Sequence, residues 1–190
     1  AIDFLRTKGQ ADDGSYTKGT GPAVTALVTA AILRHGRSAQ EPFIAKSLKY
    51  LESFVREDGG IYQSDSAYRN YETCLAVLAF SEANKDGRYT PLLKKAESFV
   101  KSLQWDEEEG HEKTSPNFGG AGYGKSKRPD LSNTAFMLDA LKSLGNGPDD
   151  PAIQKALIFV SRCQNLESEH NTTEFPVKNP DGGFYYTPAA

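Results

Sequence analysis

The sequence predicts an all-α fold, namely an array of helical hairpins of the α/α-toroid type in which outer and inner helices alternate. The first observation is an internal repeat within the 190 residues: an amphipathic stretch, a glycine-aromatic turn and a more apolar stretch follow one another several times. The second observation is that the two kinds of stretch distribute their apolar residues differently. One helical hairpin cannot bury its apolar face alone, so repeated hairpins stack. We therefore expect an incomplete ring of about seven helices.

The repeat is visible in residues at matching places along the chain. The first stretch of each repeat contains an aromatic-aliphatic pair, at Phe4-Leu5, Tyr50-Leu51, Phe99-Val100 and Phe159-Val160. The turns are Gly14-Ser15-Tyr16, Gly60-Ile61-Tyr62, Gly122-Tyr123 and Gly182-Gly183-Phe184-Tyr185. The second stretch opens with threonine, at Thr25-Ala26, Thr73-Cys74 and Thr134-Ala135. We interpret residues 1–190 as a single domain with repeats at about 1–40, 41–88, 89–147 and 148–190.

Hydrophobic periodicity and proline positions predict helices over 1–8, 22–35, 42–56, 70–84, 91–104, 131–145 and 151–164. Proline suits a first helical position because its missing N–H would lack a partner there. Pro42, Pro91 and Pro151 have such positions. The helix over 91–104 has lysines on one face and apolar residues on the other, which is typical of an outer helix. The helix over 131–145 is apolar on nearly every side, which is typical of an inner one.

The fourth repeat reaches its turn, and no inner helix follows it in this sequence. Stacked repeats need cover at each end. We therefore expect that missing C-terminal repeats of a longer natural protein, or another protein chain, cover the open end.

Composition excludes several classes of function. The chain is 38% hydrophobic and carries a formal net charge of −3, with basic and acidic residues mixed along its length. Because no stripe of lysine or arginine is present, we expect no binding to nucleic acid. The apolar runs fall short of the ~20 residues of a membrane-spanning helix, so we expect no transmembrane segment. The two cysteines, Cys74 and Cys163, are expected to be buried free thiols.

Parts of the repeat resemble a known motif. Lys95-Ala96-x2-Phe99-Val100-x3-Gln104 has the same register as the stretch that ends at Gln164, and Gln10-x3-Gly14-x-Tyr16 supplies the other half. Together these resemble the QW motif of squalene and oxidosqualene cyclases. The glycine-rich turn over 119–123 is similar to the repeats of protein prenyltransferase β subunits. The resemblance implies an α/α toroid whose inner helices surround a hydrophobic cavity, and hence an apolar small molecule, an isoprenoid, as ligand.

The resemblance also identifies where cyclase chemistry would lie. In bacterial squalene-hopene cyclases an inner helix begins with a DxDD motif, whose middle aspartate protonates the terminal alkene. This sequence has Asp130-Leu131-Ser132-Asn133 there, so Ser132 replaces the proton donor. The resemblance therefore implies that cyclase chemistry of the usual kind fails, and any activity of a terpene cyclase type stays open. From the residues alone, Asp130, Ser132 and Asn133 are interpreted as capping an inner helix.

No metal or other cofactor is expected. The prenyltransferases hold zinc through an Asp-x-Cys motif and a later histidine, and Asp-x-Cys does not occur in this sequence. The two cysteines and the three histidines, His35, His111 and His170, are too widely spaced for a recognisable zinc motif.

A candidate pocket remains at the turn-side ends of the inner helices. We nominate Glu72 and Asp130 as tentative catalytic carboxylates, and as pocket residues Tyr68, Tyr71, Ser132, Asn133 and Phe136. Glu72 is the strong acid near the register of the missing donor. Two alternatives stay open. A carbohydrate-active enzyme on an α/α toroid would need Glu72 and Asp130 to face each other across a groove. A non-catalytic scaffold would bind protein on its concave or open face.

Overall fold

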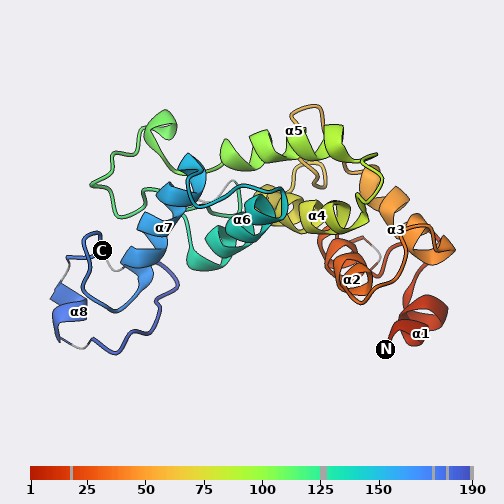
Figure 1. Ribbon diagram of the computed structural model, residues 1–190, viewed down its shortest axis with the longest axis horizontal. Helices are drawn as coiled ribbons and strands as arrows, with labels where there is room; N and C mark the ends of the chain where they lie inside the picture. Colours follow the sequence, from red (N-terminus) through yellow and green to blue (C-terminus); the bar gives the residue numbers. More distant parts are fainter. Residues whose placement is uncertain (18, 125–127, 173, 179, 189–190) are drawn as a thin grey trace. The chain divides into compact units, whose positions relative to one another are not determined.

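A computed structural model describes residues 1–17, 19–124, 128–172, 174–178 and 180–188. The chain forms two compact units, Ala1–Val100 and Lys101–Ala190 (Figure 1). Within the described residues the regular elements are helices, and extended backbone occurs only as isolated bridges. The predicted all-α class is therefore confirmed. The single domain with its four repeat boundaries stays a prediction.

The helices follow the predicted order. In the first unit they are α1 (Ile2–Phe4), the π-helix η1 (Leu5–Gly9), α2 (Ala23–Arg34), α3 (Pro42–Glu52), α4 (Arg69–Ala83) and α5 (Thr90–Lys101). In the second unit they are the 3₁₀ turn η2 (Glu107–Glu109), α6 (Leu131–Ser143), α7 (Pro151–Cys163) and α8 (Glu174–Lys178). The short elements η2 and α8 were not predicted, because a single turn has too few residues to show a hydrophobic period.

Local signals set the helix ends. Pro42 and Pro151 start their helices, and the Asp150 side chain accepts a hydrogen bond from the Ala152 N–H at 2.9 Å. The predicted helix over 42–56 ends earlier, at Glu52. The reason is that Val55 leaves the helix to form an antiparallel bridge with Ile61.

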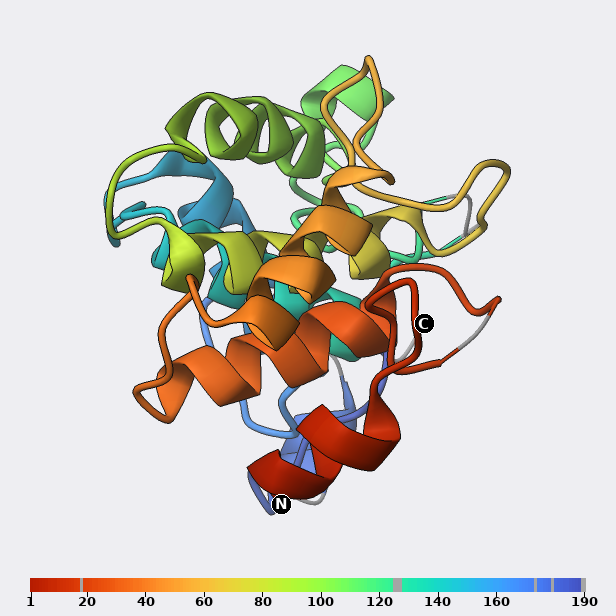
Figure 2. The same cartoon turned by 90° about the vertical axis from the view of Figure 1, so that its right-hand side faces the viewer.

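The predicted alternation of inner and outer helices is present. In α4 nearly the whole circumference is buried, and Cys74, Leu75 and Val77 are each no more than 1% exposed. In α5 only one stripe is buried, formed by Leu93, Ala96, Phe99 and Val100. Helix α2 packs along α4 within the first unit (Figure 2). Cys74 and Cys163 are buried free thiols, as predicted.

The same hydrogen-bonded turn occurs four times. One residue just after each outer helix pairs with two residues of the turn that follows. Its N–H donates to a carbonyl at 2.7–2.9 Å, in the pairs Ala11–Ser15, Arg56–Gly60, Trp105–Gly120 and Asn165–Gly183. Its own carbonyl accepts from a glycine N–H at 2.7–3.1 Å, in the pairs Ala11–Gly14, Arg56–Gly59, Trp105–Gly119 and Asn165–Gly182.

The recurring threonine fixes the first three turns to their inner helices. The threonine Oγ1 accepts from the N–H of the residue two after the turn glycine, at 3.1 Å in Tyr16–Thr25, 3.0 Å in Ile61–Thr73 and 2.9 Å in Ala121–Thr134. This register corrects the expected glycine-aromatic turns. Ile61 and Ala121 hold the place assigned to Tyr62 and Tyr123, because the position is fully buried and is filled there by smaller side chains.

The first three turn glycines also position the outer helix that follows. A Cβ on Gly14 would lie 2.5 Å from the Lys46 carbonyl oxygen of α3, and one on Gly59 would lie 2.6 Å from that of Lys95 in α5. Gly119 lies closer still to the Lys155 carbonyl of α7. All three glycines have φ between 84° and 93°, a region that side chains with a Cβ rarely adopt.

The glutamines of the QW-like pattern tie consecutive outer helices together. Gln104 Nε2 donates to Gly119 O at 2.8 Å and to Ala152 O of α7 at 2.9 Å. Gln10 Nε2 makes the equivalent bond to Phe43 O of α3 at 2.6 Å. Gln10 follows its aromatic-aliphatic pair by one residue more than Gln104 does. The π-helix η1 accommodates that residue, since Gln10 N–H bonds to Leu5 O, five positions back.

Candidate apolar ligand site

A cavity of about 580 Å³ opens between the N-terminal helix and α2 in the first unit. Its apolar wall consists of Ile2, Leu5, Leu27, Val28, Ala31 and Ile32. We refer to these six residues and the space between them as the α2 groove. Its volume falls within the range of about 300–1,000 Å³ that is typical of small-molecule sites.

The open face of α2 carries two of its larger apolar side chains. Leu27 is 51% exposed and Val24 is 39% exposed, whereas Ala26, Thr29 and Ala30 are at most 3% exposed. The small residues pack toward α4, because small side chains let two helices approach closely. Val24 and Leu27 are left on the outside, whereas Ile32 and Leu33 of the same helix are at most 8% exposed. Single exposed apolar residues are common, but a continuous stripe indicates a binding surface.

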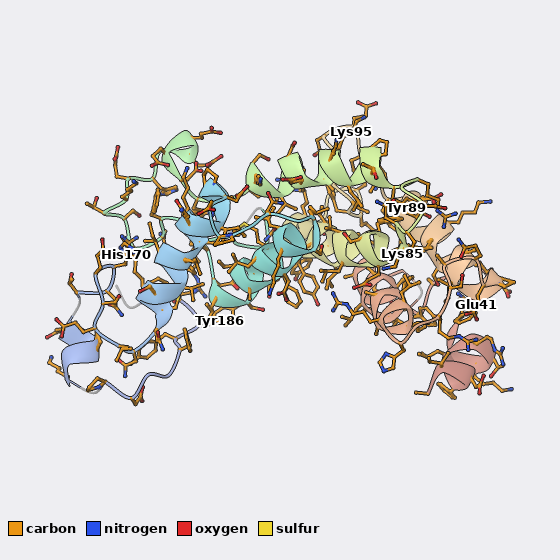
Figure 3. The ribbon with its side chains drawn as sticks, in the orientation of Figure 1. Glu41, Lys85, Tyr89, Lys95, His170 and Tyr186 are labelled. Atoms are coloured by element: carbon orange, nitrogen blue, oxygen red, sulfur yellow. The ribbon has the colours of Figure 1, made fainter. Side chains whose placement is uncertain are left out.

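The polar rim of the α2 groove is largely neutralised within the chain. Arg37 pairs with Glu41 at 2.6 Å (Figure 3), and Asp3 pairs with Arg6 at 2.9 Å. His35 Nδ1 lies 2.8 Å from the Ala31 carbonyl at the end of α2. With its polar groups paired in this way, the groove favours an apolar ligand over a charged one.

Glu72 lies in the first turn of α4 and is 5% exposed. Its Oε2 accepts from the Gln63 N–H at 2.9 Å, and its Oε1 accepts from the Ser66 hydroxyl at 3.0 Å. Burial raises the pKa of the Glu72 carboxyl, and the hydrogen bonds from Gln63 and Ser66, with the charge of Arg56, act in the opposite direction. The carboxylate therefore holds the loop before α4 against the helix, and it is also the buried acid that the sequence singled out.

Asp130 caps α6, as the sequence predicted. Its Oδ1 accepts from the Asn133 N–H at 2.9 Å and its Oδ2 from Asn133 Nδ2 at 2.8 Å. Ser132 in the same turn is exposed. The Oδ1 atom of Asn133 is buried with no hydrogen-bond partner among the described residues. Thus Asp130, Ser132 and Asn133 lie together, and both oxygens of the carboxylate have a structural task.

The C-terminal segment covers the start of α6. The Leu131 N–H donates to Tyr186 O at 2.8 Å (Figure 3). A hydrogen bond with Tyr123, reinforced by burial and the Asp130 carboxylate, raises the pKa of Tyr186. Burial, together with the Asp130 charge, raises the pKa of the Cys163 thiol to about 12. Neither group is therefore activated as an acid or a nucleophile.

The remaining nominated residues are placed as follows. Tyr68 precedes α4 and is 54% exposed, and Tyr71 lies in the first turn of α4 and is half-buried. Phe136 is half-buried on α6. Glu72 and the two tyrosines thus share the start of α4. They belong to the first unit and Asp130 to the second, so a joint site of the two carboxylates stays a prediction.

Sequence reasoning missed the α2 groove as a site. The signal was available, because Leu27, Val28, Ala31 and Ile32 form an apolar helical stripe, but such a stripe normally indicates the buried face.

Two other properties of the described residues bear on the possible chemistry. No cluster of three metal-ligating side chains occurs in the part of the chain that the structure describes. Among the same residues, none of the helices is both long enough and apolar enough to span a bilayer.

These observations define a class: an all-α array of hairpins with repeated glutamine-glycine turns and apolar inner helices. The family model for the squalene-hopene cyclase C-terminal domain matches residues 2–185. The chain therefore belongs to that family, and the predicted resemblance is confirmed. No curated protein gives a significant match to the sequence.

Proposed function

We propose that this squalene cyclase-like domain binds an apolar ligand of the isoprenoid class in the α2 groove and does not start acid-catalysed cyclisation. The observation that carries the proposal is the open apolar face of α2, with Leu27 51% exposed beside a cavity of about 580 Å³. Burying one leucine side chain against a ligand contributes about 1.5–3 kcal/mol. Micromolar affinity corresponds to about 8.2 kcal/mol after the entropic cost of association, so the ligand must contact most of the apolar wall.

None of the carboxylic acids considered has the properties of the cyclase proton donor. Protonating an alkene requires a strong, desolvated carboxylic acid. Ser132 occupies the place of the family's donor, and Asp130 accepts two hydrogen bonds from Asn133. The carboxylate at the rim of the α2 groove, Asp3, has an 88% exposed side chain and pairs with Arg6, so it is not a desolvated acid. Glu72 remains the residue to test as an acid.

The binding test uses squalene delivered from cyclodextrin to the purified chain. Leu27→Asp should weaken binding at least tenfold, because it places a charge in the apolar wall. Leu157→Asp is the matched control, since Leu157 is 50% exposed on α7 and lies outside the groove. If both variants and the unchanged chain bind squalene equally well, the assignment of the α2 groove as the ligand site is contradicted. A folded chain that binds no isoprenoid would favour the protein-binding scaffold.

Turnover is tested in the same samples. After long incubation, the extracted squalene should be unchanged by mass spectrometry coupled to gas chromatography. A cyclised product would overturn the non-catalytic part of the proposal. Its loss in Glu72→Gln, with binding retained, would then assign Glu72 as the proton donor, whereas its loss in Asp130→Asn would assign Asp130.

A further inference from the structure

The fourth turn of the repeat, at Gly182, has the same internal geometry as the turns that hold an outer helix. Asp181 Oδ1 accepts from the Gly183 N–H at 2.9 Å, as Asp13 Oδ1 does from Ser15 and Asp58 Oδ1 from Gly60, each at 2.9 Å. Gly182 has φ 73°, in the same left-handed region as the other turn glycines. The turn is therefore preformed.

What differs is the space beside it. A Cβ on Gly14, Gly59 or Gly119 would meet the backbone of the next outer helix, whereas a Cβ on Gly182 would meet no described atom within 4 Å. The residue two positions later is fully buried in the second and third turns, as Ile61 and Ala121, but Phe184 is 56% exposed. The fourth turn thus presents the surface that the other turns cover with helices.

The glutamine of this repeat gives a second, independent sign. Gln104 Nε2 donates both to its own turn and to the following outer helix, at Gly119 O and Ala152 O. Gln164 Nε2 donates to its own turn, at Gly182 O, over 3.3 Å. In the described part of the chain it has no helix carbonyl as a second acceptor. Gln164 is therefore the counterpart of Gln104, but among the described residues no following outer helix accepts its second hydrogen bond.

The occupied turns define what fits. Each of the three seated helices has proline at its first or second position and lysine four residues later, followed by a small residue: Pro42, Lys46 and Ser47; Pro91, Lys95 and Ala96; Pro151, Lys155 and Ala156. The lysine carbonyl packs on the turn glycine, and the small side chain is at most 1% exposed. The inner helix before it supplies the threonine that accepts from the turn.

We propose that the turn over 181–184 is a docking site for one kind of partner, a helical hairpin in a polypeptide segment outside residues 1–190. Its inner helix carries a threonine that accepts the Phe184 N–H, and its outer helix begins with the Pro-x3-Lys-small pattern. A second copy of the chain does not fit, because its helices with that pattern already pack on its own turns. The proposal is independent of the ligand proposed for the α2 groove.

The probe is a fluorescein-labelled peptide with the sequence of residues 20–56, which carries Thr25, Pro42, Lys46 and Ser47. We expect saturable binding to the whole chain by fluorescence anisotropy. Gly182→Val should weaken binding at least tenfold, because the new side chain fills the space for the helix backbone. Gly145→Val is the matched control: Gly145 has φ 92° and also meets no described atom within 4 Å, so both variants carry the same kind of backbone strain.

Further measurements separate the outcomes. A peptide carrying Thr25→Val should bind more weakly than the original, and far-UV circular dichroism establishes that each chain variant is folded. Peptide binding that Gly182→Val and Gly145→Val change equally would overturn the proposal, as would no binding up to about 1 mM peptide. Dimerisation of the chain alone that Gly182→Val abolishes would assign the turn to a second copy and overturn the choice of partner.

Discussion

At the scale of single residues, the fold depends on polar groups that serve buried backbone. Thr73 Oγ1 accepts from the Ile61 N–H, and Ile61 is completely buried. The repeated threonine was visible in the sequence, but its partner was not, because the two residues are brought together only by the turn. A buried N–H without an acceptor is costly, which gives the threonine its role.

The first prediction concerns this hydroxyl. Thr73→Val keeps the shape of the side chain and removes the acceptor, so it should lower the free energy of unfolding by about 1–3 kcal/mol. Urea denaturation followed by circular dichroism measures the change. Thr114→Val, at an exposed loop position, should change stability by less than about 0.5 kcal/mol. A similar small effect at Thr73 would refute the role of this bond.

The second prediction concerns pH. Burial is the largest influence on Glu72 and raises its pKa above the usual 4.5. The folded state therefore binds this proton more tightly than the unfolded state, so the contribution is present at low pH and is lost as the pH rises through the raised pKa. With Glu72 present, the free energy of unfolding should fall as the pH rises above 4.5. In Glu72→Gln, this fall should be smaller. Parallel pH profiles for the two proteins would contradict the raised pKa.

At the scale of elements, helix α2 shows where a hydrophobic pattern is ambiguous. Both faces of this helix are apolar. Hydrophobic periodicity therefore predicts an apolar stripe but does not predict whether that stripe is buried or exposed. Tertiary packing selects the face with Ala26 and Ala30 for contact with the interior and leaves Leu27 half-exposed. The same choice creates the α2 groove. Ala30 and Ala31 provide a test, because Ala30 is buried and Ala31 is exposed.

The third prediction compares Ala30 with Ala31. Ala30 is 3% exposed, so Ala30→Leu should destabilise the protein by about 1–3 kcal/mol through overpacking. Ala31 is exposed and lines the groove, so Ala31→Leu should leave stability within about 0.5 kcal/mol. It should also narrow the groove and weaken isoprenoid binding. Thermal unfolding and ligand titration measure the two effects, and the reverse order of stabilities would refute the packing of α2.

At the scale of the whole molecule, each repeat is held by its own short-range set of bonds. The threonine, the turn glycine and the next outer helix recur as a group, and within the described residues Thr73 and Thr134 share no hydrogen-bond partner. In repeat proteins, stability is approximately a sum of such local contributions. The mixed charge pattern and net charge of −3 add no strong long-range field to these contacts.

The fourth prediction is additivity. The double variant Thr73→Val, Thr134→Val should lose the sum of the two single losses, within about 0.5 kcal/mol. A double-mutant cycle of urea denaturation curves supplies the comparison. A coupling energy above about 1 kcal/mol would show instead that the repeats stabilise one another over a longer range.

The sequence by itself determined the all-α class, the order of the main helices, the alternation of inner and outer helices and the Asp130 cap. These depend on periodicity, proline positions and capping side chains, which act within a few residues along the chain. Only the tertiary structure decided the register of the turns at Ile61 and Ala121 and the open face of α2. Those features depend on which side-chain volumes fit between backbone segments that are distant in sequence, and no local pattern encodes that fit.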